Sequence, residues 1–430
     1  MLGKVKRVVV GMSSGVDSTV SALLLKKRGY EVVGAFMKNW DGVDETGVCS
    51  SDQDCEMAET IAKKLDVKFH VVNLVKEYWN EVFAELLEDY RQGLTPNPDV
   101  LCNSRVKFNH FFHHAVENIG CDAIATGHYA QNSFGSDLQY YDNNKHAKLL
   151  KSVDRTKDQT FFLAQMPQEA LRRTMFPVGD LPKTVVKQIA AQAGFHDVAA
   201  KKESMGICFV GKKSAPGRRG FQEFISEYLE DNPGNFVDID TGALIGQHRG
   251  LHHWTIGQKS RTNIDANKYV VVSKNVETNE ILIAGDSKHP SLYSEHFITS
   301  DPHWISRGPP QLRSATNRYV EAEFRFQNMA PLTQCVMMHN MSTTSNWESI
   351  NQSSLRVSTA EPMRAVTPGQ YVAFYSGEEC LGSARILRPG PSLYTLNINN
   401  CRTEIQRKLQ SRATTATAED DIKFTKEDVT

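Results

Sequence analysis

The sequence predicts an α/β protein: an N-terminal parallel sheet with helices on both faces, then a small helical domain, then a β-barrel. Over the first 130 residues, short and nearly continuous apolar stretches alternate with helical stretches, which is typical of a parallel sheet that is buried on both faces. Beyond residue 236 the apolar period becomes two and turn residues separate the segments, as in a barrel of short strands. A chain of 430 residues has room for two or three such domains.

We expect four parts, namely the sheet domain over 1–170, a central helical domain over 171–235, the β-barrel over 236–405 and a polar, disordered tail over 406–430. Strands of the first part are expected at 7–12, 31–37, 68–73 and 122–127, with helices at 16–28, 52–65, 76–92 and 105–118. The segments LRRTMFP, PKTVVKQIAAQAG and FQEFISEYL predict small helices. Hairpins are expected at 269–285 and 370–387, and a strand at 318–327.

Composition excludes some classes of protein. The formal net charge is −1, so no global basic excess indicates a nucleic-acid partner, and any RNA contact must come from local patches. No apolar run approaches the roughly eighteen residues of a membrane helix. The eight cysteines form no CxxC zinc pattern and follow no secretory signal, which predicts free thiols in a reducing compartment.

A loop of small residues, SSGVDST, joins the first predicted strand to the first helix. Gly11, Ser13, Ser14 and Gly15 let backbone N–H groups approach an anion, and the helix N-terminus adds the positive end of its dipole. The loop is not a Walker A motif, because the lysine of GK[ST] is absent, and GxGxxG does not fit it. It therefore indicates a phosphate site, the alternative being an ordinary tight turn with Asp17 at the helix start.

Two cysteines lie in segments rich in turn residues or glycine. Cys102 ends the turn-rich segment TPNPDVLC and is expected just before a helix, where the helix dipole lowers a thiol pKa. Cys208 lies in ESMGICF among apolar neighbours, after the lysine pair 201–202. The alternative for each is a buried structural thiol. Together with a phosphate loop they favour attack of sulfur on a carbonyl that adenylation has made electrophilic.

GMSSGVDST resembles the SGGxDS loop of the ATP-pyrophosphatase superfamily, whose members cleave ATP between the α- and β-phosphates and use AMP to activate a carbonyl. This sequence has Ser14 where the usual motif has glycine. The resemblance implies that the loop amides hold pyrophosphate and that Asp17 assists through Mg²⁺ or proton transfer. Met37 would line the adenine pocket, and Gly127 would close against the nucleotide. The implied ATP-binding residues are Gly11, Met12, Ser13, Ser14, Gly15, Val16, Asp17, Ser18, Met37 and Gly127.

Nine short motifs follow one another along the chain: GMSSGVDS, MKNWD, GVC, TPNPDVLCN, KFN, ATGHYA, KDQTFFL, SMGICF and PGQYVAFY. In these motifs and in their order, residues 7–390 resemble the tRNA-specific 2-thiouridylases. GVCSSDQDCE, LRRTMFP and KKESMGICF are most similar to the organellar branch, which implies mitochondria; the alternative is the bacterial cytoplasm, since the basic N-terminus runs at once into a strand.

The resemblance implies a reaction. A wobble uridine, position 34 of a tRNA, is flipped into the site, because chemistry on a base requires its removal from the stack. ATP with Mg²⁺ adenylates O2, Cys208 carries persulfide sulfur, and Cys102 attacks as the partner thiol, leaving a disulfide. Asn97, Pro98 and Asp99 contact the base, with Asp99 as the acid–base group. The products are 2-thiouridine, AMP and pyrophosphate.

The resemblance also implies partners. These are the tRNA, a cysteine desulfurase or sulfur-relay protein, and a cellular reductant that restores the cysteine pair; the enzyme is expected to be a monomer without membrane contact. Further tRNA contacts follow from motif correspondence: Lys157, Asp158 and Gln159 in KDQTFFL, His128 in TGHYA, and Arg325, Phe326 and Gln370 on predicted strands. The basic run Lys212, Lys213, Arg218 and Arg219 is either a solvated loop or a phosphate contact.

Three alternatives stay open. An amidotransferase or argininosuccinate synthase-like ligase would use the same loop without a cysteine pair, and a non-catalytic RNA-binding protein would retain the fold without turnover. An iron–sulfur cluster on Cys102, Cys208 and Asp99 is compatible with the sequence and not required by the chemistry. No metal is expected at His110, His113 and His114 or at His252 and His253, since neither group shows a carboxylate or cysteine partner in the sequence.

Overall fold

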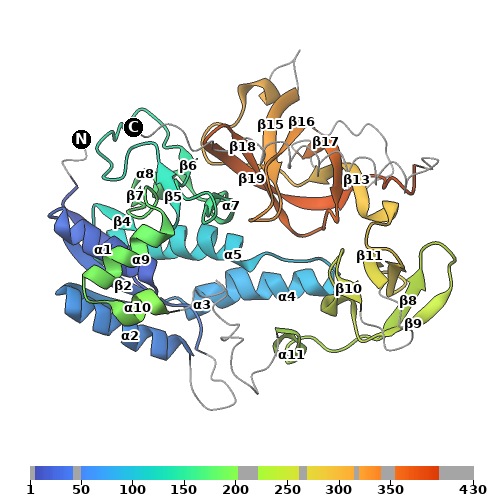
Figure 1. Ribbon diagram of the computed structural model, residues 1–430, viewed down its shortest axis with the longest axis horizontal. Coiled ribbons are helices and arrows are strands. Elements are labelled where there is room, and N and C mark those ends of the chain that lie inside the picture. The colour runs from blue at the N-terminus through green and yellow to red at the C-terminus, as the bar shows by residue number, and fades with distance from the viewer. Residues whose placement is uncertain are drawn as a thin grey trace, which may run out of the picture. The chain divides into compact units, whose positions relative to one another are not determined.

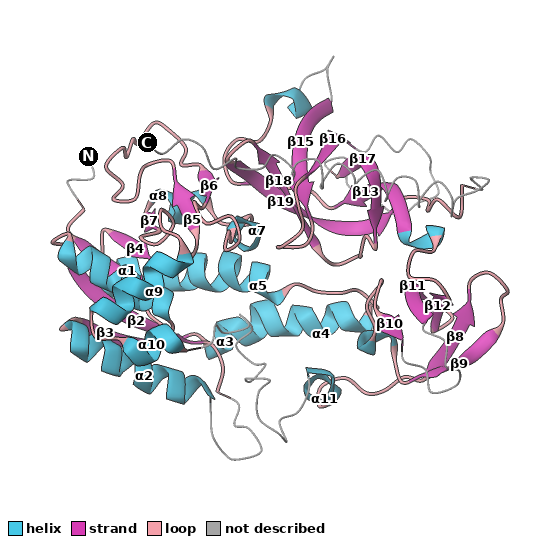
Figure 2. Ribbon diagram, viewed as in Figure 1, coloured by secondary structure: helices cyan, strands magenta, loops and turns pink. Residues whose placement is uncertain are grey.

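The computed structural model describes residues 5–41, 50–201, 221–260, 269–313, 319–339 and 354–396. The chain divides into two units. The first comprises Met1–Asp231, Ile298–Val357 and Pro368–Leu387, and the second comprises Asn232–Phe297, Ser358–Thr367 and Arg388–Thr430. Helices gather around the N-terminal sheet, whereas the described elements after Asp231 are mostly strands (Figure 2). No helix in the described ranges has the length and apolar character that crossing a membrane requires.

The N-terminal sheet has five strands, all parallel, in the order β3-β2-β1-β4-β7. Three of them, β2, β4 and β7, are labelled in Figure 1. Their bounds are β1 Arg7–Gly11, β2 Glu31–Lys38, β3 Lys68–Asn73, β4 Ala123–Ala125 and β7 Thr174–Met175. The valines of β1 are fully buried, as expected for a central strand of a sheet that is covered on both faces. The predicted parallel sheet is thereby confirmed.

The strand order reverses beside β1, because the chain runs from β1 to β2 on one side and β4 lies on the other. Ligands of such sheets bind at the carboxyl ends of the strands, beside a switch point of this kind. The loops after β1 and after β4 both leave the sheet at this edge. The predicted phosphate loop is the first of these loops.

Two helices, α1 Val16–Lys27 and α2 Ser50–Leu65, follow β1 and β2. The connection from β3 to β4 is almost wholly helical: α3 Val75–Tyr78, η1 Trp79–Phe83, α4 Ala84–Arg91, α5 Pro98–Leu101, η2 Cys102–Phe111, α6 Phe112–His114 and η3 Ala115–Ile119. The second helical stretch begins at Pro98 rather than at the predicted 105. Asn97 caps it, since its side chain accepts a hydrogen bond from the backbone N–H of Val100, and a proline suits the first helical position.

After β4 the chain forms β5 Ala130–Asn132, β6 Leu149–Lys151 and α7 Thr160–Leu163. The central region then contains α8 Gln168–Arg172, β7, α9 Lys183–Gln192, α10 His196–Ala200 and α11 Phe221–Ser226. The prediction of a helix for LRRTMFP was wrong beyond Arg172, because Thr174 and Met175 pair with β4 as the fifth strand. Tertiary pairing at the sheet edge overrides the helical pattern of so short a segment.

The C-terminal barrel is built on a nine-stranded sheet in the order β13-β17-β16-β15-β18-β19-β6-β5, in which β14 pairs with β19 and a β13–β19 pairing closes the barrel. Its later strands are β13 Tyr293–Thr299, β14 His303–Trp304, β15 Tyr319–Arg325, β16 Thr333–His339, β17 Leu355–Arg364, β18 Tyr371–Ser376 and β19 Glu379–Pro389. The antiparallel pairing of β18 with β19 confirms the predicted hairpin at 370–387.

The second unit holds a separate five-stranded sheet in the order β10-β11-β12-β8-β9. The strands are β8 Gly234–Asp238, β9 Leu244–His248, β10 Lys259–Ser260, β11 Tyr269–Asn275 and β12 Glu280–Ala284. The β11–β12 pair confirms the predicted hairpin at 269–285. The region predicted as one β-barrel over 236–405 thus contains two sheets.

A buried ion pair links the N-terminal domain to β15 within the first unit. The guanidinium of Arg325 is 9% exposed and the carboxylate of Asp158 is 3% exposed, and the two form a salt bridge. Arg325 also donates to the hydroxyl of Tyr375 at 3.2 Å and to the carbonyl of Asn328 at 3.0 Å. Asp158 accepts from the Thr160 hydroxyl at 2.8 Å. The segment that carries Lys157, Asp158 and Gln159 is therefore fixed to the barrel by a charged network.

The network predicts a large asymmetry between two substitutions. Asp158→Ala should lower the free energy of unfolding by about 3 kcal/mol, because it leaves the guanidinium of Arg325 buried without its carboxylate. Glu378→Ala removes the surface partner of Arg155, where both side chains are more than half exposed, and should cost less than about 0.5 kcal/mol. Denaturant unfolding of both variants measures the difference, and equal costs would contradict the assigned role of the buried pair.

Candidate active site

The phosphate loop is held by its own serines. The Ser18 hydroxyl lies 3.1 Å from the backbone nitrogen of Ser13, which donates to it, and the backbone N–H of Gly15 donates to the Ser13 hydroxyl at 3.2 Å. Met12 and Val16 are buried in the core and offer the loop only their backbone. The φ angle of Ser14 is not positive, so a side chain at this position, where the motif has glycine, causes no backbone strain.

Gly127 packs directly against this loop. A Cβ atom added at Gly127 would lie 2.7 Å from the backbone nitrogen of Ser18 and 2.8 Å from the carbonyl carbon of Asp17, closer than any ordinary contact. The loop after β4 can approach the loop after β1 this closely only because residue 127 has no side chain. Gly127, which was predicted for the ATP site, thus contacts the phosphate loop itself.

Asp17 lies at the centre of a small polar group. Its carboxylate oxygens lie 2.8 and 2.7 Å from Nζ of Lys183, and the Tyr129 hydroxyl donates to Oδ1 at 2.9 Å. Lys183 begins α9, 166 residues away in sequence, and its side chain is 9% exposed. The two oxygens of the Asp17 carboxylate, beside a loop of small residues, fit the hard oxygen coordination of Mg²⁺.

The segment TPNPDVLCN places its polar residues around the first turn of α5. The Asp99 carboxyl is half-buried, and burial raises its pKa above the usual range, while the charge of Lys107 lowers it in part. Cys102 is buried and follows α5 directly. The prediction that Cys102 precedes the helix was wrong, because its backbone N–H already bonds the carbonyls of Pro98 and Asp99 inside the helical stretch. The helix dipole acts chiefly on the first turn and is weaker at Cys102.

Lys107 and His128 bring a second polar group close to this helix. Nζ of Lys107 lies 3.4 Å from Nε2 of His128 and 3.0 Å from the Asn103 side-chain oxygen, and His128 Nδ1 lies 2.8 Å from the Thr126 hydroxyl. Burial, and then the charge of Lys107, hold the pKa of His128 well below its usual range. A neutral ring with its proton on Nδ1 satisfies both contacts, since lysine can only donate.

The stretch from Thr126 to Tyr129 therefore touches both halves of the site. Gly127 contacts the phosphate loop. The Tyr129 hydroxyl donates to Asp17 in α1, the helix that follows this loop. Between them, His128 meets Lys107 on the helix that carries Cys102. A four-residue segment cannot span a long distance, so the phosphate loop and the helix after TPNPD border the same space.

Gln370 and Gly369 hold the TPNPD segment from the barrel side. The Gln370 amide donates to the carbonyls of Thr95 and Pro96, each at 3.0 Å, and its oxygen lies 3.3 Å from Nδ2 of Asn97. Gly369 has a φ of +93°, and a Cβ there would lie 2.8 Å from the Thr95 carbonyl oxygen. The PGQ turn before β18 thus fixes the start of α5 by close backbone approach.

The residues expected to contact tRNA differ in how far their side chains are exposed. Asp158 and Arg325 are buried against each other, and Phe326 is 6% exposed in the core of the barrel. Gln159 accepts a hydrogen bond from the Tyr129 backbone, which supports the ATGHY segment. Lys157, His128 and Gln370 keep partly exposed side chains. Met37 lies beside the phosphate loop, with its Cε 3.4 Å from a Cβ that would be added at Gly11.

Some sequence expectations cannot be placed. Cys208 and the basic run of Lys212, Lys213, Arg218 and Arg219 lie outside the described residues. Of the three residues expected to take part in sulfur transfer or to hold a cluster, the described chain contains Cys102 and Asp99.

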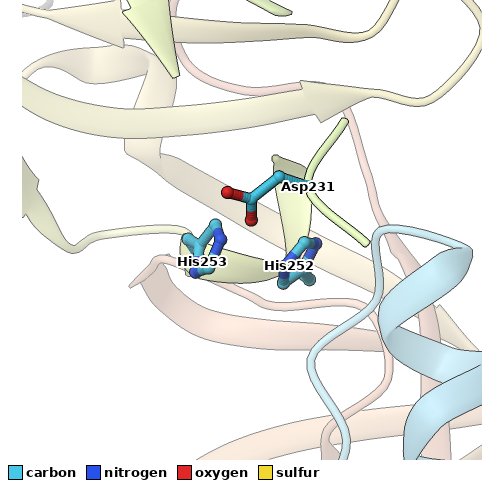
Figure 3. A group of neighbouring side chains, drawn as sticks. All are labelled: Asp231, His252 and His253. Atoms are coloured by element: carbon cyan, nitrogen blue, oxygen red, sulfur yellow. The ribbon is translucent and has the colours of Figure 1, made fainter. Parts of the chain in front are cut away.

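The histidine groups that the sequence singled out have separate surroundings. His110 Nε2 lies 2.6 Å from Glu81, and His113 forms an i,i+4 pair with Glu117. The rings of His252 and His253 lie 4.0 Å apart, centroid to centroid (Figure 3). Asp231, also drawn there, ends the first unit, whereas both histidines belong to the second, so no metal site is assigned to the three.

Sequence reasoning missed three residues of this site, namely Lys107, Tyr129 and Lys183. Lys107 and Tyr129 occur in the motifs KFN and ATGHYA, which carried the family resemblance but assigned them no role. Lys183 lies in a segment that gave only a helical pattern. A lysine of such a segment has no local signal that it pairs with a carboxylate 166 residues away in the sequence.

A parallel sheet with a loop of small residues at its switch point, a carboxylate in the helix after that loop and a buried cysteine on the helix that Lys107 joins to His128 is an arrangement that suits a nucleotide-dependent transferase. Three domain families match the chain in order: the tRNA methyl transferase HUP domain over 6–212, the tRNA methyl transferase PRC-barrel domain over 222–285 and the aminomethyltransferase β-barrel domain over 294–386. These matches confirm the N-terminal nucleotide-binding fold and the C-terminal barrel.

The chain is 44% identical over 431 residues to the mitochondrial tRNA-specific 2-thiouridylase 1 of Gallus gallus, covering 95% of this chain and 98% of that protein. It is 41% identical to the tRNA-specific 2-thiouridylase MnmA of Levilactobacillus brevis, over 88% of this chain and 95% of that protein. The chain therefore belongs to the tRNA-specific 2-thiouridylase family. A 4-thiouridine synthetase in complex with RNA and ATP aligns with a TM-score of 0.30 at 14% identity, covering 52% of this chain and 50% of that one, a likeness too low to support an argument.

The close approach at Gly127 predicts a specific defect. Gly127→Ala should weaken binding of an ATP analogue by about tenfold or more, because the added methyl group must push the loop at Asp17–Ser18 out of position. Gly285→Ala is the matched control, since a Cβ there meets nothing within 4 Å. Isothermal titration of both variants tests this, and unchanged affinity in Gly127→Ala would show that the loop yields without consequence.

The environment of Asp99 predicts a pH effect with a definite sign. Lys107 lowers the pKa of Asp99, so Lys107→Met should raise that pKa further, and the activity limb that reports Asp99 should move to higher pH. Lys107→Arg keeps the charge and should leave the limb near its wild-type position. The pH profile of single-turnover AMP formation measures both. A limb that moves to lower pH in Lys107→Met would contradict the assignment.

Proposed function

We propose that this chain catalyses ATP-dependent 2-thiolation of the wobble uridine, position 34, of tRNA. The observation that carries the proposal is the Thr126–Tyr129 segment, which contacts the phosphate loop and the Cys102 helix at once. Such an arrangement brings the α-phosphate of ATP close to a base held at TPNPD, as adenylation of a carbonyl oxygen requires. Membership in the 2-thiouridylase family supports the same assignment.

In the first step, backbone N–H groups at the start of α1 hold the phosphates of ATP, since those of Met12, Ser13 and Gly15 donate within the protein. Asp17 would hold Mg²⁺, which when bound would supply positive charge to the phosphates and the leaving pyrophosphate. Uridine O2 attacks the α-phosphorus, and the bond to the β-phosphate oxygen breaks. The purine lies toward Met37, whose side chain flanks Gly11. This step makes C2 electrophilic and releases pyrophosphate.

In the second step, sulfur replaces the adenylated oxygen. The terminal sulfur of a persulfide on Cys208 forms a bond to C2, and AMP leaves with the former O2. Cys102 then attacks Sγ of Cys208, the persulfide S–S bond breaks, and the electron pair passes to the C2 thiocarbonyl. A Cys102–Cys208 disulfide results, which an external dithiol must reduce before the next turnover.

Asp99 serves as the acid–base group for the target base, and Asn97 and Pro98 contact that base. The raised pKa of Asp99 suits this role, because a carboxyl that can hold a proton closer to neutral pH can both donate and accept one. Among the remaining residues, we propose that Lys157, His128 and Gln370 contact the tRNA. Asp158, Gln159, Arg325 and Phe326 act by fixing the segments that carry them, since their side chains are buried or already bonded.

The chemistry requires partners: a tRNA with a wobble uridine, a cysteine desulfurase or sulfur-relay protein that forms the persulfide, and a reductant. We propose that the protein acts as a monomer in mitochondria. Relatives from several animals carry mitochondrial names, in keeping with the second proposal.

The cysteine pair provides the test. Purified protein is incubated with ATP, Mg²⁺, a desulfurase, cysteine and an unmodified tRNA carrying a wobble uridine, and nucleosides and AMP are measured by mass spectrometry. Wild type should form 2-thiouridine and AMP in equal amounts, while Cys102→Ser and Cys208→Ser should lose 2-thiouridine by more than about 100-fold, as expected when a nucleophile is removed.

The matched control is Cys121→Ser, a buried thiol at the end of the same helical connection, which should retain activity. AMP without any thiolated base in wild type would favour an amidotransferase or ligase instead. Full activity in Cys102→Ser would remove the two-cysteine mechanism.

A further inference from the structure

The phosphate loop contains no lysine, yet two lysines reach it from the region after the sheet. Lys183 is the first residue of α9 and Lys201 follows α10, 166 and 187 residues from their partners at the loop. In a loop of the Walker A type the cation comes from the loop itself. Here the corresponding charge is supplied from another part of the fold.

Lys183 is fixed from two directions. Its Nζ lies 2.8 and 2.7 Å from the two carboxylate oxygens of Asp17, and it lies 5.4 Å from the ring centroid of Tyr129. Its backbone N–H donates to Oδ2 of Asp154 at 2.9 Å, which fixes the start of α9. Removing a lysine from water is costly, so a 9% exposed ammonium group beside an anion loop needs a strong anionic partner.

Lys201 contacts the phosphate loop at Ser14, directly after the exposed Ser13. Its Nζ donates to the Ser14 hydroxyl at 2.5 Å and lies 3.2 Å from Oδ1 of Asp54 in α2, and the Ser14 hydroxyl donates to the same oxygen at 2.5 Å. Ser14 occupies the position where the SGGxDS motif has glycine. The contact between Lys201 and the loop therefore depends on the one residue by which this loop departs from the motif.

We propose that Lys183 and Lys201 are phosphate ligands, which move from Asp17, Asp54 and Ser14 to the phosphate oxygens when ATP binds. Two lysines and two carboxylates balance at the loop, so each cation is kept in place at little net charge. A triphosphate brings stronger acceptors, and release of Asp17 from Lys183 frees its oxygens for Mg²⁺. Both lysines then stabilise the leaving pyrophosphate. This inference rests on the proposed use of ATP at this loop.

The proposal makes Ser14 a positioning residue. A glycine at position 14 would remove the hydroxyl through which Lys201 contacts the loop, and would leave its contacts to Asp54 and Met57 of α2. Ser14→Gly should therefore weaken ATP binding less than Lys201→Met does, and the two changes should not be additive, because both act through the same contact.

The experiment compares two probes on the full chain. Affinity for α,β-methylene-ATP, which carries the phosphates, and for adenosine, which does not, is measured by titration calorimetry for wild type, Lys183→Met, Lys201→Met, Lys183→Arg and Lys187→Ala. Lys187 lies one turn along the same helix and is the matched control. Thermal unfolding of each variant is recorded alongside.

We expect Lys183→Met and Lys201→Met each to lose about tenfold or more in affinity for the ATP analogue, with adenosine affinity unchanged. Lys183→Arg should recover part of the loss, and Lys187→Ala should behave as wild type. If Lys183→Met does not fold, Lys183→Arg and Lys201→Met still provide the test.

An unchanged affinity for the ATP analogue, or an equal loss for adenosine, would overturn the proposal and leave the two lysines as structural ion pairs. A wild-type protein that binds adenosine and the analogue at no measurable level would instead contradict the proposed function itself.

Discussion

The close approach of Gly127 to the backbone of Asp17 and Ser18 is the constraint on which the rest of the site depends. The sheet order places the loops after β1 and β4 beside each other, but only a residue without a side chain lets them touch. Tyr129 and His128 follow directly, and each reaches a different half of the site. A displacement at Gly127 would therefore move the phosphate loop relative to the helix that carries Cys102.

The barrel contributes to the same geometry from the opposite end of the chain. Gln370 and Gly369 hold the TPNPD segment through backbone contacts, and the buried pair of Arg325 and Asp158 holds the segment that supports Tyr129 through Gln159. Both connections join residues more than 150 positions apart. The parts of the barrel that belong to the first unit are thus a structural support for the nucleotide domain, in addition to any contact they make with tRNA.

The fold could be predicted where the local pattern is strong. The apolar runs of β1 to β3 and the period-two hairpins at β11–β12 and β18–β19 are long enough to identify strands without tertiary information. Thr174 and Met175 could not be identified, since two residues carry no period and only pairing with β4 makes them a strand. The sequence predicts too late a start for the helical stretch that begins with α5, because the apolar pattern does not show that Asn97 caps it.

The site residues, too, could be predicted only in part. The loop residues and Gly127 could be predicted, because their small side chains and the order of the motifs are visible in the sequence. The buried state of Asp158 and Arg325 and the contacts of Lys183 and Lys201 are not visible there, because each partner comes from a distant element. A charged residue in a motif looks the same in the sequence whether it faces RNA or another charge.

The proposed mechanism requires that O2 of the wobble uridine becomes bonded to the α-phosphorus of ATP at the phosphate loop beside Gly127. A tRNA carrying ¹⁸O at C2 of that uridine tests this step, with the isotope content of AMP and of water measured after one turnover. We expect one ¹⁸O atom in the phosphate of each AMP formed with 2-thiouridine. If the label is found in water or in pyrophosphate, O2 was never adenylated, and the mechanism assigned to this site would be contradicted.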